Sequence, residues 1–288
     1  MVPEKIGDIK SADVVKDEQG RQYHIGLAPG ELAENIILVG NPERPNKAKE
    51  FFTEITKETQ AREYKTITGK INDLEVSVMS TGIGPDNVEI ALVEIMQITR
   101  APTLIRAGSC GALQEFIDVG DLVISTGAVR LENTSIYFVP EGYPAVAHYE
   151  VVLALSEAAN ICGGMYHLGL TASASGFYGA QGRDIPGLPV RFPTLPEDLA
   201  KIKVYNFEME TSTLFNLSQV LGLRAGSVCA VYINRPRGTF IPNDLLSNAE
   251  KKCLETAIKA FEILQKMDQI KRNQNKSYWI PSLSLPED

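Results

Sequence analysis

The chain has 288 residues, of which 44% are hydrophobic and 22% charged, and its formal net charge is −8. This length suits one large α/β domain or two smaller ones, and the composition is that of a soluble globular protein. The acidic balance argues against nucleic acid or an anionic membrane as the main partner, although a local group of arginines can still bind an anionic substrate.

Targeting and redox signals are few. There is no apolar run of about 18 residues, as a membrane-spanning helix requires, and the first residues, MVPEKIGDIK, lack the apolar core of a secretory signal. The four cysteines form no CxxC pair and are expected to be reduced and mostly buried. We therefore expect a cytoplasmic protein with no nucleic-acid or membrane partner.

Apolar runs and helical spacings alternate along the chain. Strands are predicted at 35–40, 75–81, 102–108, 121–126, 167–173 and 225–234. Helices are predicted at 46–55, 87–98, 149–162, 211–222 and 248–267. With no linker or repeat, this alternation predicts one α/β domain over 1–288 with a largely parallel or mixed sheet covered by helices. Residues from about 272 to 288 lose periodicity and are expected to form an extended tail, anchored by Trp279 on the body or on a neighbouring subunit.

The segment NFEMETS, 206–212, places Glu208 and Glu210 between an apolar strand and an apolar helix. Carboxylates in such a position need partners. Paired carboxylates suggest acid–base work on a glycosidic bond, but we expect these two to point to opposite sides of an extended segment. We therefore do not expect a matched acid and base.

Two arginines follow or lie within predicted strands. Gly40 and Arg44, in the turn after the first strand, could bring backbone amides and a guanidinium to an anion, although the pattern also fits an ordinary turn. Arg106 lies inside an apolar strand and needs an anionic partner. That partner is either an internal carboxylate or a phosphate that Ser109 and nearby glycine amides also bind. Arg62 has no role that spacing alone assigns.

A glycine-rich loop after another strand carries Phe177, Gln181 and Arg183. The amide and the guanidinium could bind a carbonyl–NH–carbonyl edge while an aromatic ring stacks on a flat heterocycle. His24 could be core, surface or ligand-binding. The sequence contains no HExxH, nucleophile-elbow triad or GxGxxG pattern, which disfavours metal hydrolysis, serine hydrolysis and dinucleotide redox chemistry.

Nine segments between Gly40 and Arg235 together resemble the nucleoside phosphorylase superfamily of the hexameric purine nucleoside and uridine phosphorylase type. They are VGNPER, AREY, MSTGIG, IRAGSCGAL, VGDLVIST, GFYGAQGR, NFEMETSTL, GLRAGSVCAV and INR. The chain looks most similar to uridine phosphorylases, because Gln181 and Arg183 match that family's uracil-binding pair. In addition, Ile233-Asn234-Arg235 replaces the Ser-Asp that purine enzymes use at the purine N7.

The resemblance implies a single α/β domain with a mixed, partly barrel-like sheet and a pentosyltransferase that converts uridine and phosphate to uracil and ribose 1-phosphate. It implies no organic cofactor, a candidate potassium site near Glu63 at a subunit interface, and a homodimer as the minimal active unit, which can assemble into a hexamer. A purine or broad-specificity phosphorylase and a non-catalytic nucleoside-binding protein remain alternatives.

The resemblance also implies roles for individual residues. Phosphate would contact Gly40, Arg44, Arg106, Ser109 and, from the adjoining subunit, Arg62. Ribose would contact Glu208, Met209 and Glu210, with the partner's His24 near its 5′-hydroxyl, and the base would contact Phe177, Gln181 and Arg183. Arg106, Glu210 and Arg183 are the expected catalytic residues.

Overall fold

The structure is a computed structural model that describes residues 13–284. Every predicted strand is present: β1 (Asn35–Val39), β4 (Leu74–Ser80), β5 (Thr103–Ala112), β6 (Leu122–Leu131), β8 (Tyr166–Ala174) and β10 (Arg224–Asn234). The hairpin of β2 (Glu54–Ala61) and β3 (Tyr64–Ile71) and three short strands, β7 (Ala145–Val146), β9 (Val204–Glu208) and β11 (Thr239–Phe240), complete the set.

The strands form one mixed sheet that closes on itself at one end. Strands β10, β6, β8, β9 and β5 follow one another, and β10 also pairs with β5, which completes a five-stranded ring. From β5 the sheet continues as an open extension through β1, β4, β3 and β2. The predicted mixed, partly barrel-like sheet is therefore confirmed. Because β4, β1 and β5 are parallel, their carboxyl ends lie at one edge, where α/β folds bind ligands.

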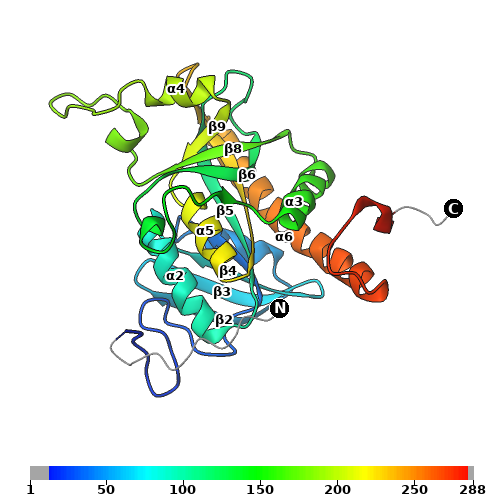
Figure 1. Cartoon of the computed structure of the whole chain (residues 1–288). Helices are drawn as coiled ribbons and strands as arrows, with labels where there is room; N and C mark the ends of the chain where they lie inside the picture. Colours follow the sequence, from blue (N-terminus) through cyan, green and yellow to red (C-terminus); the bar gives the residue numbers. More distant parts are fainter. Residues whose placement is uncertain (1–12, 285–288) are drawn as a thin grey trace.

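Helices cover both faces of this sheet (Figure 1). On one side α2 (Pro85–Ile98) packs with α5 (Thr211–Val220), and on the other α3 (Tyr149–Cys162) packs with the long α6 (Asn243–Asn273). The shorter helices are α1 (Arg44–Ala48) and α4 (Leu195–Lys201).

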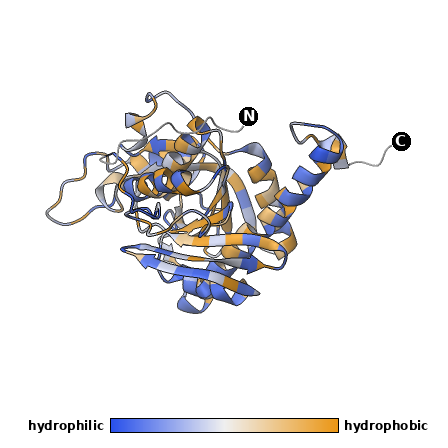
Figure 2. Cartoon of the chain, turned by 90° about the horizontal axis from the view of Figure 1, so that it is seen from below, coloured by the Kyte–Doolittle hydropathy of each residue, from blue (hydrophilic) through white to orange (hydrophobic). Residues whose placement is uncertain are grey.

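Strand β1 shows why both faces are covered. Ile37 and Val39 belong to the hydrophobic cluster that contains the apolar faces of α3 and α6. Ile36 and Leu38 point the other way, into the cluster with α2 and α5. A strand buried on both sides is a continuous apolar run rather than an alternating one. Figure 2 shows hydrophobic residues concentrated in the central strands, whereas the outermost strands and the far end of α6 are largely hydrophilic.

Two local predictions differ from the structure. The helix predicted at 46–55 is only α1, followed by a 3-10 turn at Lys49–Phe51, and the chain is a strand from Glu54. The β-branched residues Thr53, Ile55 and Thr56 of this segment favour a strand, and the segment pairs with β3 at the edge of the sheet. The apolar spacing alone therefore predicted a helix wrongly here. At the other end α6 is longer than predicted, because it continues to Asn273.

Beyond α6 the chain turns and forms a 3-10 helix at Pro281–Ser284. The backbone N–H of Trp279 donates to Glu150 of α3, and its side chain packs against the main hydrophobic cluster. Residues 285–288 of the predicted tail lie outside the described residues. Within 13–284, none of the helices combines the length and apolar character that crossing a membrane requires.

Candidate active site

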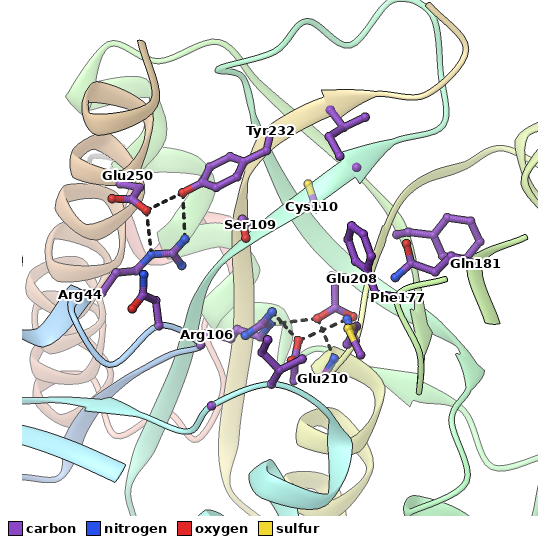
Figure 3. Close-up of a pocket in the computed structure, with 18 of the residues that line it drawn as sticks. Arg44, Arg106, Ser109, Cys110, Phe177, Gln181, Glu208, Glu210, Tyr232 and Glu250 are labelled. Carbon is purple, nitrogen blue, oxygen red and sulfur yellow. Dashed lines mark hydrogen bonds and ion pairs between the residues drawn. The ribbon is translucent and has the colours of Figure 1, made fainter. Parts of the chain in front are cut away.

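A cavity of about 890 Å³ lies at the edge where the carboxyl ends of β1, β4 and β5 meet (Figure 3). Most residues predicted to bind a ligand line it, although they come from distant segments. They are Gly40, Arg44, Glu63, Arg106, Ser109, Phe177, Gln181, Arg183, Glu208, Met209 and Glu210. Arg62 and His24, which were expected to come from a partner subunit, are not among its lining residues.

Arg106 is buried beside both glutamates of NFEMETS. Its Nε donates to Glu208 Oε2 at 2.9 Å, and its Nη2 lies 2.5 Å from Glu210 Oε2. Burial opposes the charge of Arg106, but the two carboxylates outweigh burial and raise its pKa. The internal salt bridge that the sequence left open therefore exists. Among the described residues, Nη1 has no partner and remains available to a ligand.

The two glutamates do not point to opposite sides, so that expectation is wrong. Residues separated by two positions share a face of a strand, and β9 ends at Glu208 before α5 begins at Thr211. Both carboxylates consequently contact the same guanidinium. They remain unsuited to act as acid and base, because each is already engaged by Arg106.

Glu208 supports the site from behind. Its side chain is 1% exposed, and it accepts hydrogen bonds from Ser173 and from the backbone N–H groups of Glu210 and Thr211. These contacts satisfy the first amide of α5, which has no partner within the helix. Because protein donors already occupy the Glu208 carboxylate, the geometry favours its predicted ribose contact less than that of Glu210.

Glu210 has fewer protein contacts. Its Oε1 accepts the Gly84 N–H at 2.7 Å, and its Oε2 accepts the Met209 N–H at 3.2 Å. Burial raises the pKa of Glu210, and Arg106 works against that rise. Glu210 is therefore a buried carboxylate at the cavity wall, suited to bind hydroxyl groups.

Close packing around Arg106 requires a glycine. A Cβ on Gly108 would lie 2.9 Å from both the Arg106 guanidinium carbon and Cys229 Sγ. No side chain fits there unless the arginine moves. Gly108 thus permits Arg106 and Ser109 to reach the cavity from the same strand.

Arg44 is also buried, and each of its three nitrogens has a protein partner. Its Nε lies 3.3 Å from Glu250 Oε1, its Nη1 donates to the Ala107 carbonyl at 3.2 Å, and its Nη2 donates to the Tyr232 hydroxyl at 2.9 Å. Burial would lower the pKa of Arg44, but Tyr232, Cys253 and Glu250 together raise it. Two buried arginines thus face the cavity near Ser109 (Figure 3).

The other end of the cavity carries the predicted base-binding residues. Arg183 Nε donates to the Phe177 carbonyl at 2.8 Å, and its guanidinium lies 4.1 Å from the Phe177 ring centroid. Burial lowers the pKa of Arg183. Gln181 is 3% exposed, and among the described residues its side-chain amide has no hydrogen-bond partner. Its donor and acceptor therefore remain free for a ligand.

The Ile233-Asn234-Arg235 segment offers no acid to this cavity. Ile233 lines it, whereas Asn234 is fully buried and donates to the carbonyls of Gln114 and Ile117. Arg235 Nη1 donates to the Gln181 carbonyl at 2.6 Å and so holds the base-binding loop.

Arg62 and His24 lie together on the surface. Arg62 Nη2 donates to the Tyr23 hydroxyl at 3.1 Å, and the Tyr23 ring packs edge-on against the His24 ring. His24 Nδ1 lies 2.6 Å from Glu94 of α2, which also accepts the backbone N–H groups of His24 and Ile25. No pattern in the sequence indicates that Tyr23 and Glu94 contact these two residues.

Glu63 lines the cavity from the β2–β3 turn, close to Gly82. Hard cations prefer several oxygen ligands, and within 13–284 no group of three or more His, Cys, Asp or Glu side chains is arranged to hold a metal ion. The predicted potassium site at Glu63 stays a prediction.

Sequence reasoning missed Tyr232 and Glu250. The spacing of Glu250 could have indicated its burial. It precedes Cys253, Leu254 and Ala257 by three, four and seven residues, which places it on the apolar face of α6. A carboxylate on such a face needs a partner. Tyr232 carries no comparable signal, because an aromatic residue is ordinary in an apolar strand.

Comparison with known proteins agrees with this geometry. Residues 34–265 match the Phosphorylase superfamily. The chain belongs to this superfamily. It is 44% identical over 277 residues to a uridine phosphorylase of Thermococcus kodakarensis, covering 95% of this chain and 97% of that protein. It is 36% identical over 244 residues to the uridine phosphorylase of Escherichia coli, covering 83% and 96% of the two chains.

A solved structure extends the likeness to the fold of this phosphorylase-superfamily chain. A Trypanosoma brucei nucleoside phosphorylase, described as showing uridine phosphorylase activity, matches with a TM-score of 0.79 and 27% identity. The match covers 86% of this chain and 99% of that one. The family predicted from the ordered motifs is confirmed.

Proposed function

We propose that this protein is a uridine phosphorylase, a pentosyltransferase that converts uridine and phosphate reversibly to uracil and ribose 1-phosphate. One observation carries the proposal. Two buried arginines, a carboxylate suited to hydroxyl groups and a free Gln–Arg pair line a single cavity of about 890 Å³. The named activity of the relatives at 44% and 36% identity supports the same reaction.

Phosphate is proposed to bind at the Arg44 and Arg106 end. The Ser109 hydroxyl and the backbone N–H of Gly40 would complete its contacts, since charge-assisted hydrogen bonds bind anions most strongly. Arg106 would then contact phosphate and both glutamates at once. Its Nε and Nη2 contact Glu208 and Glu210, and its other N–H groups remain available to phosphate. Its charge places the nucleophile beside the ribose carbon that it attacks.

Ribose is proposed to lie on Met209 with its hydroxyls on Glu210. As the bond between the ribose C1′ and the base nitrogen breaks, positive charge develops on the sugar and negative charge on the base. Phosphate and Glu210 stabilise the first, and Arg183 stabilises the second at a ring carbonyl. The electron pair of the broken bond leaves with the base, and a phosphate oxygen forms the new bond to C1′.

The base end favours a pyrimidine over a purine. Gln181 has a free acceptor and free donors, and Arg183 has donors only, which complements a carbonyl–NH–carbonyl edge. A purine leaving group is helped by protonation at N7, and Asn234 supplies no acid for it because it is buried against two carbonyls. Uracil needs no such acid, since its negative charge spreads over ring carbonyls.

Charge supports a site shared between two copies of the chain. Three arginines, Arg44, Arg106 and Arg183, and four glutamates, including Glu63 and Glu250, line the cavity, so its lining carries an excess of one negative charge when all are ionised. A phosphate dianion needs a further cation in such a site. We propose that Arg62 of a second copy supplies this cation at the phosphate and that His24 of the same copy lies near the 5′-hydroxyl of the ribose, within a homodimer that can assemble into a hexamer.

The test is uracil release from uridine at increasing phosphate concentration, compared with inosine under the same conditions. The proposal expects saturable dependence on phosphate and a higher kcat/KM for uridine. Faster turnover of inosine would instead support a purine or broad-specificity enzyme. Binding of uridine without uracil release would identify a non-catalytic nucleoside-binding protein.

A further inference from the structure

Arg44 has five N–H groups, and protein atoms occupy three of them. Glu250 takes Nε–H, the Ala107 carbonyl takes one N–H of Nη1, and the Tyr232 hydroxyl takes one N–H of Nη2. Among the described residues, this leaves one N–H on each terminal nitrogen. These two N–H groups carry the charge of the guanidinium and can donate charge-assisted hydrogen bonds to an oxyanion.

The Tyr232 hydroxyl has a fixed direction. It donates to Glu250 Oε1 at 2.6 Å, so the lone pairs of its oxygen are left to accept from Arg44. Burial, together with Glu250, raises the pKa of Tyr232, so the hydroxyl keeps the proton that it donates. Glu250 is in turn held by Lys47, which closes the network on α1. Figure 3 shows the triangle of Arg44, Tyr232 and Glu250 at the cavity wall.

We propose that Tyr232 is a positioning residue for phosphate binding, which holds Arg44 so that its two unused N–H groups face the anion, with Glu250 as the anchor of the Tyr232 hydroxyl. This inference rests on the proposed phosphorylase function. Tyr232 need not touch phosphate or nucleoside, because it acts through the guanidinium that it orients.

A purely structural role for the hydroxyl makes a different prediction. Loss of packing or of a buried hydrogen bond would weaken the fold and disturb phosphate and nucleoside binding alike. Positioning through Arg44 weakens phosphate binding selectively, and only while Arg44 is present. A double-mutant cycle separates the two, because residues that act together are not additive.

The experiment measures the Kd of inorganic phosphate by calorimetry and the KM of uridine for the full-length protein and its variants. Tyr232→Phe is expected to weaken phosphate binding about five- to tenfold, as the loss of one hydrogen bond does, and to leave the uridine KM within about twofold. Tyr166→Phe is the matched control, because the Tyr166 hydroxyl accepts a hydrogen bond from Ser156 and does not line the cavity. It should leave phosphate binding unchanged.

The cycle is completed with Arg44→Ala and the Arg44→Ala/Tyr232→Phe double variant. The proposal expects Tyr232→Phe to change phosphate binding by less than about twofold in the Arg44→Ala background. An equal loss in both backgrounds, no loss in either, or a matching rise in the uridine KM would overturn it. Because phosphate binding is measured without turnover, failure of this inference is distinguishable from absence of phosphorolysis, which would refute the proposed function.

Discussion

Replacing Arg106 with methionine would leave two buried carboxylates without their shared cation. The exposed fractions of the Glu208 and Glu210 side chains are 1% and 4%, so water cannot replace the guanidinium. Breaking a buried ion pair by removing one partner costs about 3–5 kcal/mol. For a domain of this size, that corresponds to a fall in Tm of roughly 10 °C at neutral pH.

The pH dependence of this loss distinguishes charge from packing. In Arg106→Met, burial and mutual repulsion raise the pKa of the carboxylate pair above the unfolded value of about 4.3. The folded variant then binds a proton that the unfolded chain has released. Its stability therefore rises as the pH falls from the raised folded pKa towards the unfolded pKa, by up to about 1.4 kcal/mol per pH unit for each proton. Wild type should show the same trend more weakly, because burial already raises the pKa of Glu210 despite Arg106.

Thermal unfolding between pH 5 and 8 measures the effect. The gap in Tm between wild type and Arg106→Met is expected to narrow steadily towards pH 5. The double variant Arg106→Met/Glu208→Gln is the control, because it removes one of the two charges and should recover part of the loss at pH 8. A gap of constant size at every pH would refute the electrostatic explanation and leave only the lost packing of the arginine.

Three further predictions concern substrate selectivity, subunit sharing and thiol chemistry. Arg183→Ala should raise the KM of uridine at least about tenfold, the loss expected for a hydrogen bond from a charged group, and leave the Kd of phosphate nearly unchanged. A weakened phosphate Kd with an unchanged uridine KM would instead assign Arg183 to phosphate binding. Arg62→Ala and Glu210→Gln should each be nearly inactive, yet co-expressed chains should regain about a quarter of wild-type activity if each site draws on both subunits of a dimer; no recovery in isolated mixed dimers would show that Arg62 does not act in the partner's site. Cys162 should be the only thiol of the four that reacts rapidly with a thiol reagent in the folded protein, because the other three are buried, and burial raises the pKa of Cys253 to about 12; mass spectrometry of the labelled peptides identifies the site.

The sheet and the cavity could be predicted from sequence for a clear reason. Strands buried on both faces appear as apolar runs that end in small or polar residues, and the ordered motifs place Arg106 within β5 and place Gln181 and Glu210 after β8 and β9. The pairing of β5 with β9, and of β9 with β8, brings these segments to one cavity. The edge strand β2 was missed because it is solvent-exposed and carries few apolar residues and no alternation strong enough to outweigh the preceding helical spacing.

Contacts between side chains were not predictable in the same way. The sharing of Arg106 by Glu208 and Glu210 depends on how the chain turns after β9, which spacing alone does not determine. The contact of Arg44 with Glu250 joins residues 206 positions apart, and neither residue type indicates the other. Partners of this kind emerge only when the fold brings the two segments together.

We propose that phosphate and uridine react in one cavity lined by Arg106, Glu210 and Arg183. The most direct test follows uracil release from uridine by the wild-type protein while phosphate is varied from zero to saturation, with ribose 1-phosphate measured as the second product. A phosphorylase should show no turnover without phosphate, saturation as phosphate rises, and equal amounts of the two products. Uracil release that is independent of phosphate and yields free ribose, or no release at any phosphate concentration, would contradict it.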